Sequence, residues 1–411
     1  MISRPYSRIL VVVAVALFFT GLDVYLFTSE MAGLPPLYFI IGFIVVAAPL
    51  LFSNSSLVLL RQSSLARWCL GFFMISGLWF LLQPLISDDA FQELRIRFLS
   101  VSFILVLLCL LRSEDALLWM RRTIFASVLL AIGLNVYELF SPLTFSSVAG
   151  RSAGFYINPN ISGAALVVGM ILTIGLLPQR YRMLFAAAVG TGVFLTFSRS
   201  AIAGWFISML AIVITRQISL RKSLIIAGSV IAISSLLIIS EWDQLRYQLE
   251  DAGVLNSNVT ERLEWLSNLT ANDASATDRY DVVGIAFEKF ADSPIVGNGI
   301  GASHKLLWTH GDIVVSSHNQ YINLMVDHGA LGIFILPLFV AAVVWRARGD
   351  TKQIAVTFAI FILFMGFFSH NLLEERYILL PATLLSAMAL ASRRETVVDT
   401  GGKSLIMRRA A

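Results

Sequence analysis

The 411-residue chain is 57% hydrophobic and only 14% charged, with a mean hydropathy of +0.79. Soluble domains carry a charged share near a quarter, so this composition excludes an ordinary soluble globular protein and indicates a chain embedded in a bilayer. The net charge of +4 comes from Lys and Arg scattered between apolar stretches. Because these residues do not cluster, no nucleic-acid partner is predicted.

The chain begins with Arg4 and Arg8, followed by an apolar stretch without a small-residue cleavage site, which favours a first membrane span over a cleaved signal peptide. A span needs about twenty mainly apolar residues. About twelve spans are predicted as helices, near residues 9–27, 36–53, 68–85, 98–111, 123–140, 161–177, 183–197, 201–215, 223–240, 329–345, 353–368 and 377–391. Cys69 and Cys109 fall in apolar stretches and are predicted to be buried thiols, not a disulfide.

The Lys and Arg residues predict the orientation of these spans. With both termini in the cytoplasm, 20 of the 30 basic residues fall on the cytoplasmic side. Five of the others lie in one long segment that is too long to obey the positive-inside rule. The predicted fold is an all-α integral membrane protein with nine spans over 1–240, a long periplasmic segment over 241–328, three spans over 329–391 and a basic cytoplasmic tail over 392–411.

All five histidines fall on the predicted periplasmic side: His304, His310, His318, His328 and His370. The simplest structural reason is that most lie in or beside the one long polar segment, where polar residues must go. The histidines show no HExxH pattern, and Asp88–Asp89 is not an Asp-x-Asp pair, so no metal site is predicted. The chain also lacks a glycine-rich phosphate loop and a dinucleotide fingerprint, and no cofactor is predicted.

Two arginines are candidates for binding an anion. Arg199 lies in a four-residue hairpin between two spans, at the outer boundary where the orientation rule disfavours a positive charge. It either extends to lipid headgroups or binds a phosphate. Arg279 lies near the start of a helix predicted to be capped by Thr277, and it continues the apolar stripe that leads to Phe290. Such a charge needs either a carboxylate such as Asp278 or an anionic ligand.

His318 is the candidate base. Ser317 and Gln320 have the spacing of a capping box, which predicts that His318 is the first residue of a helix. The partial positive charge of a helix start disfavours imidazolium and leaves a ring able to accept a proton. A histidine at such a position is otherwise a satisfied polar residue.

Two other outer loops carry weaker candidates. Arg151 lies in a turn-rich loop that leads to Asn160, which either caps the next span or contacts a ligand. The last outer loop contains His370, and its Glu375 and Arg376 are adjacent residues that can pair with each other.

The run His318–Asn319, followed after nine residues by Gly329 and Gly332, resembles the H-N-x9-G-x-x-G signature of bacterial O-antigen ligases. The segment from Arg279 through Gly301 is similar to the region just upstream in that family, and Ser198–Ala201 is similar to its membrane-boundary arginine motif. These pieces cover about 150–345, and the profile of twelve spans extends the resemblance to nearly the whole chain. The wider family also contains O-antigen polymerases and protein O-oligosaccharyltransferases.

The resemblance implies a GT-C-like glycosyltransferase in the bacterial inner membrane. It would transfer O-polysaccharide from undecaprenyl diphosphate to a sugar hydroxyl of lipid A-core at the periplasmic face, with inversion and without a metal. Arg199 and Arg279 would stabilise the departing diphosphate, and His318 would activate the acceptor hydroxyl. Arg151, Asn160, Asn319 and Tyr321 are the predicted donor-binding residues.

Because both substrates are lipids, the pocket is expected to open sideways to the membrane lipids, covered by amphipathic stretches near 242–249 and 262–269. Three alternatives stay open. The first two are a polymerase, whose acceptor is another lipid-linked repeat, and a protein glycosyltransferase, although these usually have a longer C-terminal part. The third is a transporter of lipid-linked glycans, for which the same side chains would form a substrate site.

Overall fold

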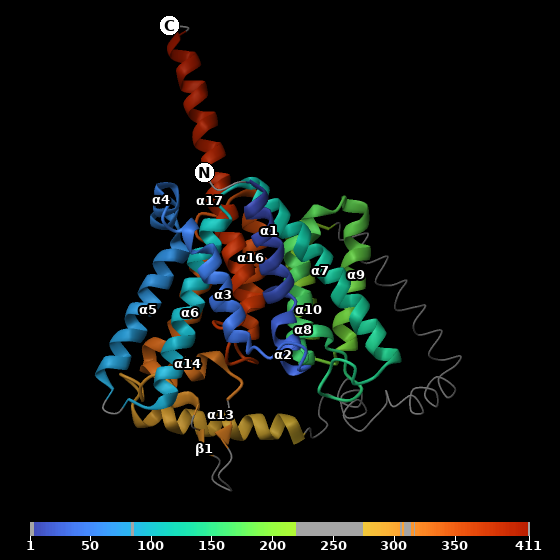
Figure 1. Cartoon of the computed structure of the whole chain (residues 1–411), viewed down its shortest axis with the longest axis vertical. Helices are drawn as coiled ribbons and strands as arrows, with labels where there is room; N and C mark the ends of the chain where they lie inside the picture. Colours follow the sequence, from blue (N-terminus) through green and yellow to red (C-terminus); the bar gives the residue numbers. More distant parts are fainter. Residues whose placement is uncertain are drawn as a thin grey trace. The chain divides into compact units, whose positions relative to one another are not determined.

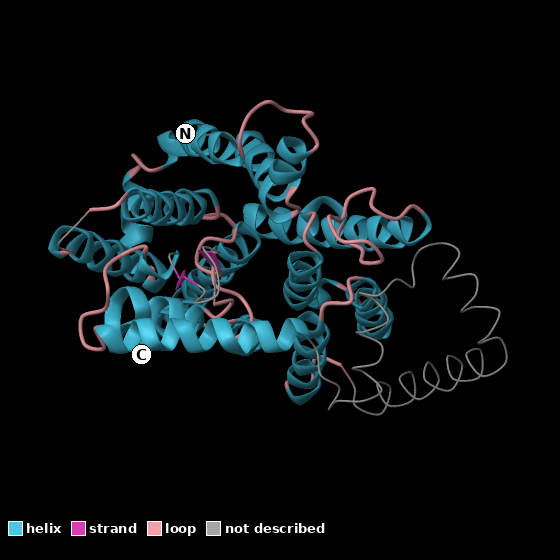
Figure 2. Cartoon of the chain, turned by 90° about the horizontal axis from the view of Figure 1, so that it is seen from below, coloured by secondary structure: helices cyan, strands magenta, loops and turns pink. Residues whose placement is uncertain are grey.

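The computed structural model describes residues 4–83, 86–218, 274–304, 306–307, 314–315 and 317–409. The predicted span 223–240, the amphipathic stretches 242–249 and 262–269, and His310 lie outside these residues. The described part of the chain is built from helices, with one short antiparallel strand pair (Figures 1 and 2). In this pair, β1 (Leu306–Leu307) and β2 (Val314–Val315) place Leu306 opposite Val315.

The chain divides into two compact units, each assembled from segments that are distant in sequence. Unit 1 contains Met1–Ala14, Leu37–Met120 and Val282–Ala411, and unit 2 contains Val15–Pro36 and Arg121–Asp281. Helices α7 and α13 each pass from one unit into the other. The sequence analysis predicted four regions that are each continuous in sequence: 1–240, 241–328, 329–391 and 392–411. That division stays a prediction.

Unit 1 holds the helices from both ends of the chain. They are α1 (Arg4–Ala14), α3 (Pro36–Ala47), η2 (Ala48–Leu50), α4 (Asn54–Gln62), α5 (Ser64–Leu82), α6 (Asp88–Leu110), the C-terminal part of α13 (Ala274–Asp292), η5 (Ala302–His304), α14 (Gln320–His328), η6 (Gly329–Phe334), α15 (Ile335–Val344), α16 (Gly349–Met365) and α17 (Arg376–Arg409). Serine side chains fix several helix starts, because Ser63 caps α5 and Ser87 caps α6 by accepting a backbone N–H. The cap at Ser87 starts α6 ten residues before the predicted span 98–111, and this extension carries charged side chains.

Unit 2 is built around α8. Its elements are the π-helical turn η1 (Val15–Phe19), α2 (Leu22–Thr28), α7 (Glu114–Phe140), η3 (Gly154–Tyr156), α8 (Pro159–Thr173), η4 (Ile174–Leu176), α9 (Gln179–Leu195) and α10 (Arg199–Ile214). Asn158 caps α8, and Pro159 at its first position has no N–H that needs a partner. At Gly163, an added Cβ would lie 2.6 Å from the Cβ of Ala201, so the starts of α8 and α10 touch.

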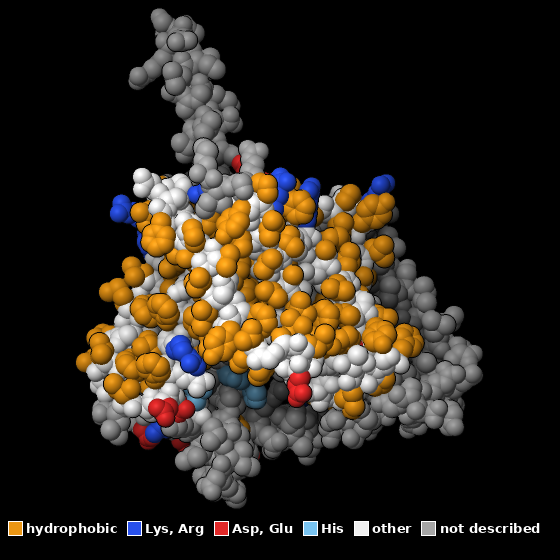
Figure 3. Space-filling model, in the orientation of Figure 1, with side chains coloured by type: hydrophobic (Ala, Val, Ile, Leu, Met, Phe, Trp, Pro, Cys, Tyr) orange, Lys and Arg blue, Asp and Glu red, His pale blue; other side chains and the backbone are white. Residues whose placement is uncertain are grey.

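Four described helices are long and apolar enough to cross a membrane, and six if each of two bent helix pairs counts as one span. The four are Ser64–Leu82, Glu114–Phe140, Pro159–Leu176 and Gln320–Val344. Large apolar side chains are exposed on these helices, for example Leu70 and Met74 on α5, and apolar side chains cover much of the face in Figure 3. The prediction of a helical, multi-pass membrane protein is therefore confirmed, whereas twelve spans, cytoplasmic termini and a GT-C-like fold stay predictions.

The chain bends within one predicted span and at the end of another. The stretch 9–27 bends by 56° between Phe19 and Leu22, where Gly21 adopts a φ of 72° that favours glycine. The stretch 36–53 ends in η2, which contains Pro49, and the chain then turns by 110° into α4. Hydropathy identified both segments, but it does not report the backbone conformation inside an apolar stretch.

Candidate functional site

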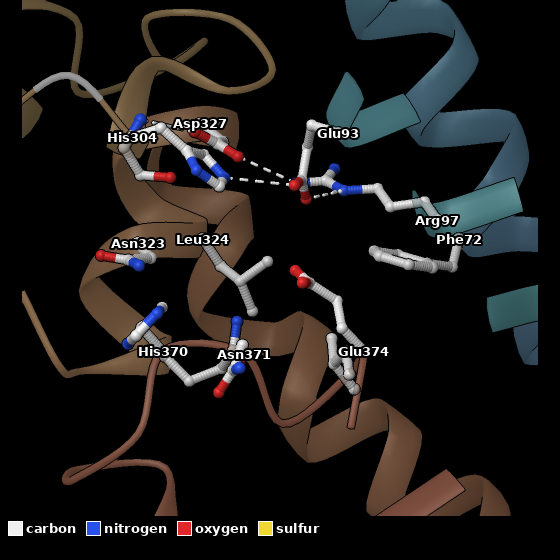
Figure 4. A pocket seen from close by; sticks show the side chains of 13 residues that line it. Phe72, Glu93, Arg97, His304, Asn323, Leu324, Asp327, His370, Asn371 and Glu374 are labelled. Carbon is white, nitrogen blue, oxygen red and sulfur yellow. Dashed lines mark hydrogen bonds and ion pairs between the residues drawn. The ribbon is translucent and has the colours of Figure 1, made fainter. Parts of the chain in front are cut away.

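A polar cavity of about 100 Å³ lies within unit 1, between α6, η5, α14 and the loop before α17 (Figure 4). Its lining residues are Phe72, Glu93, Arg97, Ser303, His304, Gln320, Asn323, Leu324, Asp327, His370, Asn371, Leu373 and Glu374. Carboxyl, amide and imidazole groups dominate this lining, so the cavity suits a ligand that forms many hydrogen bonds.

Arg97 is the central cation of this cavity and is 3% exposed. Its Nε donates to Glu93 over 2.7 Å, and its Nη2 donates to Asp327 over 2.8 Å. Its Nη1 donates to Ser76 over 3.1 Å. The guanidinium is therefore neutralised by two carboxylates, which is the condition under which a buried charge is tolerated.

His328 completes the surroundings of Arg97. Nη1 of Arg97 lies 2.7 Å from Nε2 of His328. Arginine can only donate, so Nε2 of His328 accepts and its proton sits on Nδ1. Arg97, Asp327 and His328 together tie α6 to the end of α14. The loop that carries His318 enters α14 at its other end.

His304 contacts the same carboxylate group from the outer side. Its Nε2 lies 3.2 Å from Oε2 of Glu93, and its side chain is about half exposed. The hydrogen bond to Glu93 raises the pKa of His304 to about 8, although partial burial opposes the shift. At neutral pH the pair is therefore mostly an ion pair.

His318 lies just before α14 and not inside it, so the predicted capping box is wrong. Asn319 is the N-cap, and its side chain accepts from the backbone N–H groups of Tyr321 and Ile322. His318 is exposed and has a φ of 49°. The argument that a helix start lowers its affinity for a proton no longer applies. Its ring instead meets that of His370 edge-on, with centroids 5.3 Å apart.

His370 connects His318 to the cavity, because it lines the cavity and contacts the His318 ring. Burial lowers the pKa of His370 to about 4, and positive charge on His318 and His304 contributes to the shift. The His370 ring is therefore neutral at pH 7. A neutral imidazole donates a hydrogen bond from one ring nitrogen and accepts one at the other.

The two predicted substrate-binding residues that follow His318 have structural contacts. Asn319 uses its side chain as the helix cap, and Tyr321 donates its hydroxyl to the carbonyl of Leu363 over 2.8 Å. Gln320 accepts from the backbone N–H of Leu372 over 2.7 Å. The bond between Gln320 and Leu372 joins the start of α14 to the loop that carries His370, and the rings of His318 and His370 are in contact.

Unit 2 brings together two of the predicted donor-binding residues. Nη2 of Arg151 donates to Oδ1 of Asn160 over 2.9 Å, and its Nε donates to the carbonyl of Thr196 over 2.9 Å. Arg151 is 6% exposed. Thr196 lies three residues before Arg199. The bond to Thr196 therefore connects Arg151 to the segment that leads into the Arg199 hairpin.

The loop around Arg151 is organised by Glu138, which the sequence analysis did not single out. Its Oε1 accepts from the backbone N–H groups of Phe145 and Ser146, and its Oε2 accepts from those of Ala153 and Gly154. Glu138 is 3% exposed. A single buried carboxylate thus satisfies four backbone donors of the 141–158 loop.

Arg199 is the first residue of α10 and follows Ser198, the N-cap residue. Phe197 before it has a φ of 46°, which forms the sharp turn of the hairpin. Arg279 lies within α13, which begins at Ala274 and not at the predicted cap Thr277. The side chain of Arg279 lies outside the described part of the structure. Farther along α13, Val282 and Ala286 pack against Val326 of α14.

Residues 183–337 match a family model described as O-antigen ligase. This part of the chain is similar to the O-antigen ligase family. This match confirms the predicted superfamily, whose ligase- and polymerase-type glycosyltransferases act in lipopolysaccharide biosynthesis. The chain resembles no curated protein closely enough to count as a match.

The matched region, 183–337, contains Arg199, Arg279 and His318, together with Asn319 and Tyr321. Arg151 and Asn160 precede it. The cavity combines residues from inside and outside this region, because His304 and Asp327 fall within 183–337 whereas Arg97 and Glu374 do not.

Sequence reasoning missed Glu93, Arg97, Asp327 and Glu374 as cavity residues. One signal was present, because charged side chains that border or interrupt an apolar stretch are costly in a membrane and need partners. Glu93 and Arg97 are also spaced by four residues, which places them on one helix face. Their third partner, Asp327, is 230 residues from Arg97, and no local pattern indicates that contact.

Proposed function

We propose that this protein transfers O-antigen polysaccharide from undecaprenyl diphosphate to a sugar hydroxyl of lipid A-core, at the periplasmic face of the bacterial inner membrane. The match to the O-antigen ligase family over 183–337 is the observation that carries the proposal. The reaction completes lipopolysaccharide, inverts the anomeric centre and needs no metal or nucleotide. The donor is already activated as a diphosphate.

The acceptor hydroxyl oxygen attacks the anomeric carbon, and the bond from that carbon to the diphosphate oxygen breaks. His318 takes the hydroxyl proton, and undecaprenyl diphosphate leaves with the bonding electrons. The exposed position of His318 beside a polar cavity supports this role. Contact with the neutral ring of His370 supports it further.

The leaving diphosphate needs fixed cations where negative charge develops. We assign this role to Arg199 and Arg279, with Arg151 and Asn160 binding the donor. The bond between Arg151 and Asn160 supports their joint assignment, because it holds the guanidinium in one orientation. Asn319 and Tyr321 contribute by shaping the loop that carries His318.

The test is a reconstituted reaction with the full-length protein in detergent, lipid-linked glycan as donor and lipid A-core as acceptor. We expect product with and without EDTA. His318→Ala and Arg279→Ala should each reduce the rate by about 10²-fold or more while membrane insertion stays normal. Exposed Glu288 provides a control, Glu288→Gln, that should be fully active.

Each alternative has its own outcome. No product from the wild-type protein contradicts a transferase, and product that disappears with EDTA contradicts a metal-free reaction. A fully active His318→Ala protein refutes its role as the base. In a deletion strain, loss of ligated polymer with accumulation of lipid-linked polymer supports the ligase, whereas a core bearing one repeat indicates a polymerase.

A further inference from the structure

Three polar groups that line the cavity have no protein partner among the described residues. No hydrogen bond or ion pair joins the carboxyl group of Glu374 to them, and Nδ1 of His370 is buried without a hydrogen-bond partner among them. Asn323 uses its Oδ1 to accept from Ser317, which leaves its amide N–H groups for the cavity. These groups surround Leu324 in Figure 4. Grouped around one cavity, these side chains offer hydrogen-bond donors and acceptors to a ligand.

The same cavity has little to offer an anion. Every nitrogen of Arg97 is engaged, and its charge is balanced by Glu93 and Asp327. His304 is paired with Glu93. The other groups are a carboxyl, a neutral imidazole and an amide. A diphosphate would meet carboxylates there without an available cation.

A sugar ring fits this set of groups well. Its hydroxyls both donate and accept, so they match the carboxyl of Glu374, the imidazole of His370 and the amide of Asn323. Leu324 offers an apolar contact for the C–H groups of a ring. Burial and the negative charge of Glu93 raise the pKa of Glu374, which favours an uncharged ligand over a cation.

We propose that the cavity binds the sugar ring of lipid A-core that carries the accepting hydroxyl, through Glu374, His370 and Asn323. This assignment rests on the proposed function and names the acceptor subsite. Contact between His370 and His318 selects the acceptor over the donor sugar, because the hydroxyl that loses its proton must reach His318. Glu374 and Asn323 then act as specificity residues.

The test measures equilibrium binding to the full-length protein in detergent, without requiring catalysis. The probes are lipid A-core, lipid A without core sugars, and undecaprenyl diphosphate without glycan. The variants are Glu374→Leu, which removes the carboxyl, and His370→Phe, which keeps a ring beside His318 and loses both nitrogens. Glu288→Gln on the exposed face of α13 is the matched acidic control.

We expect both cavity variants to raise the Kd for lipid A-core by about tenfold, the loss expected when a hydrogen bond to the ligand is removed. Binding of lipid A and of undecaprenyl diphosphate should change less than about twofold, as should all binding by the control. Gel filtration and thermal unfolding verify folding. If Glu374→Leu fails to fold, the Kd of His370→Phe for lipid A-core tests the proposal.

Unchanged binding of lipid A-core by a folded cavity variant overturns the subsite. The proposed function then survives, provided that the wild-type protein still forms product in the reconstituted reaction. Weaker binding of undecaprenyl diphosphate overturns the acceptor assignment in favour of the donor. Equal weakening for lipid A and lipid A-core also overturns it, because the cavity would then not recognise a core sugar. A wild-type protein that neither binds lipid A-core nor forms product overturns both proposals.

Discussion

Arg97 is a buried cation that forms ion pairs with two carboxylates, one near it in the sequence and one far from it. Glu93 lies one helical turn before it, and Asp327 comes from a distant helix. Both carboxylates are as buried as the guanidinium, with side-chain exposures of 5% or less. Replacing one member leaves the other charges buried without a counter-ion, which costs more than the intact cluster contributes.

Arg97→Met should therefore destabilise the protein by about 3–5 kcal/mol, because Glu93 and Asp327 lose their shared cation. Thermal unfolding of the purified protein in detergent measures this loss. Arg95→Met is the matched control, because Arg95 is exposed on the same helix and its replacement should leave the unfolding midpoint unchanged. An Arg97→Met protein as stable as the wild type would contradict the structural role of the cluster.

The pair of His304 and Glu93 predicts a dependence of stability on pH. The pKa of His304 is raised above its ordinary value of about 6.5, to about 8, chiefly by its hydrogen bond to Glu93. A raised pKa means that this stabilisation is complete below pH 6.5 and is lost as the pH rises through 8. Because the His304 side chain is 49% exposed, we expect at most about 1 kcal/mol.

Unfolding midpoints between pH 6 and 9 measure this effect. His304→Gln should flatten the fall in stability between pH 6.5 and 8.5. If the stability of the wild type and of His304→Gln falls equally over this pH range, groups other than His304 cause the pH dependence.

The loop 141–158 shows how one side chain can determine the conformation of a segment without regular structure. Glu138, near the end of α7, accepts four backbone N–H groups from this loop. Arg151 in the same loop then reaches Asn160 and Thr196. The position of a predicted donor-binding residue thus depends on a carboxylate that lies on another element.

Glu138→Gln should loosen this loop, because an amide accepts through one oxygen only and its NH2 group would face backbone donors. We expect a cost of about 1–3 kcal/mol for the donors left without a partner. Faster hydrogen exchange of residues 141–158 measures it. Glu30→Gln is the control, because Glu30 is exposed in the same unit. Unchanged exchange in Glu138→Gln would contradict this organising role.

The contact between α8 and α10 depends on the absence of a side chain at Gly163. A Cβ there would lie 2.6 Å from the Cβ of Ala201 and 3.0 Å from Oγ1 of Thr196. Gly163→Ala should therefore lower stability by about 1–3 kcal/mol, which thermal unfolding measures. Gly133→Ala on α7 meets nothing within 4 Å and should be neutral or stabilising. Equal effects of the two changes would refute the close contact.

The orientation of the whole chain in the membrane is the broadest prediction. Exposed Ser147 lies in a predicted periplasmic loop, and exposed Ser113 lies in a predicted cytoplasmic loop. In a background with Cys69 and Cys109 replaced, an impermeant maleimide should label Ser147→Cys in spheroplasts and Ser113→Cys only after disruption. The opposite pattern would reverse the predicted topology. Labelling of both in intact spheroplasts would contradict the predicted span 123–140 that separates them.

The apolar stretches that hydropathy identified are largely helical in the described part of the chain, and the family motif pointed to His318. Both signals are local. A chain in lipid must satisfy its backbone within each helix, so an apolar stretch of sufficient length specifies a helix without reference to its neighbours. Motif spacing is likewise a property of adjacent residues. It did not reveal that Asn319 and not Ser317 caps α14, because both side chains suit a cap and tertiary contacts chose between them.

Only the tertiary structure decided which polar side chains meet. It joined Arg97 to Asp327, His318 to His370, and Arg151 to the carbonyl of Thr196. A buried cation requires a counter-ion, but the sequence alone does not tell which carboxylate in the chain provides it. The packing of helices far apart in sequence selects the partner. The same packing leaves the side chains of Glu374 and His370 lining a cavity.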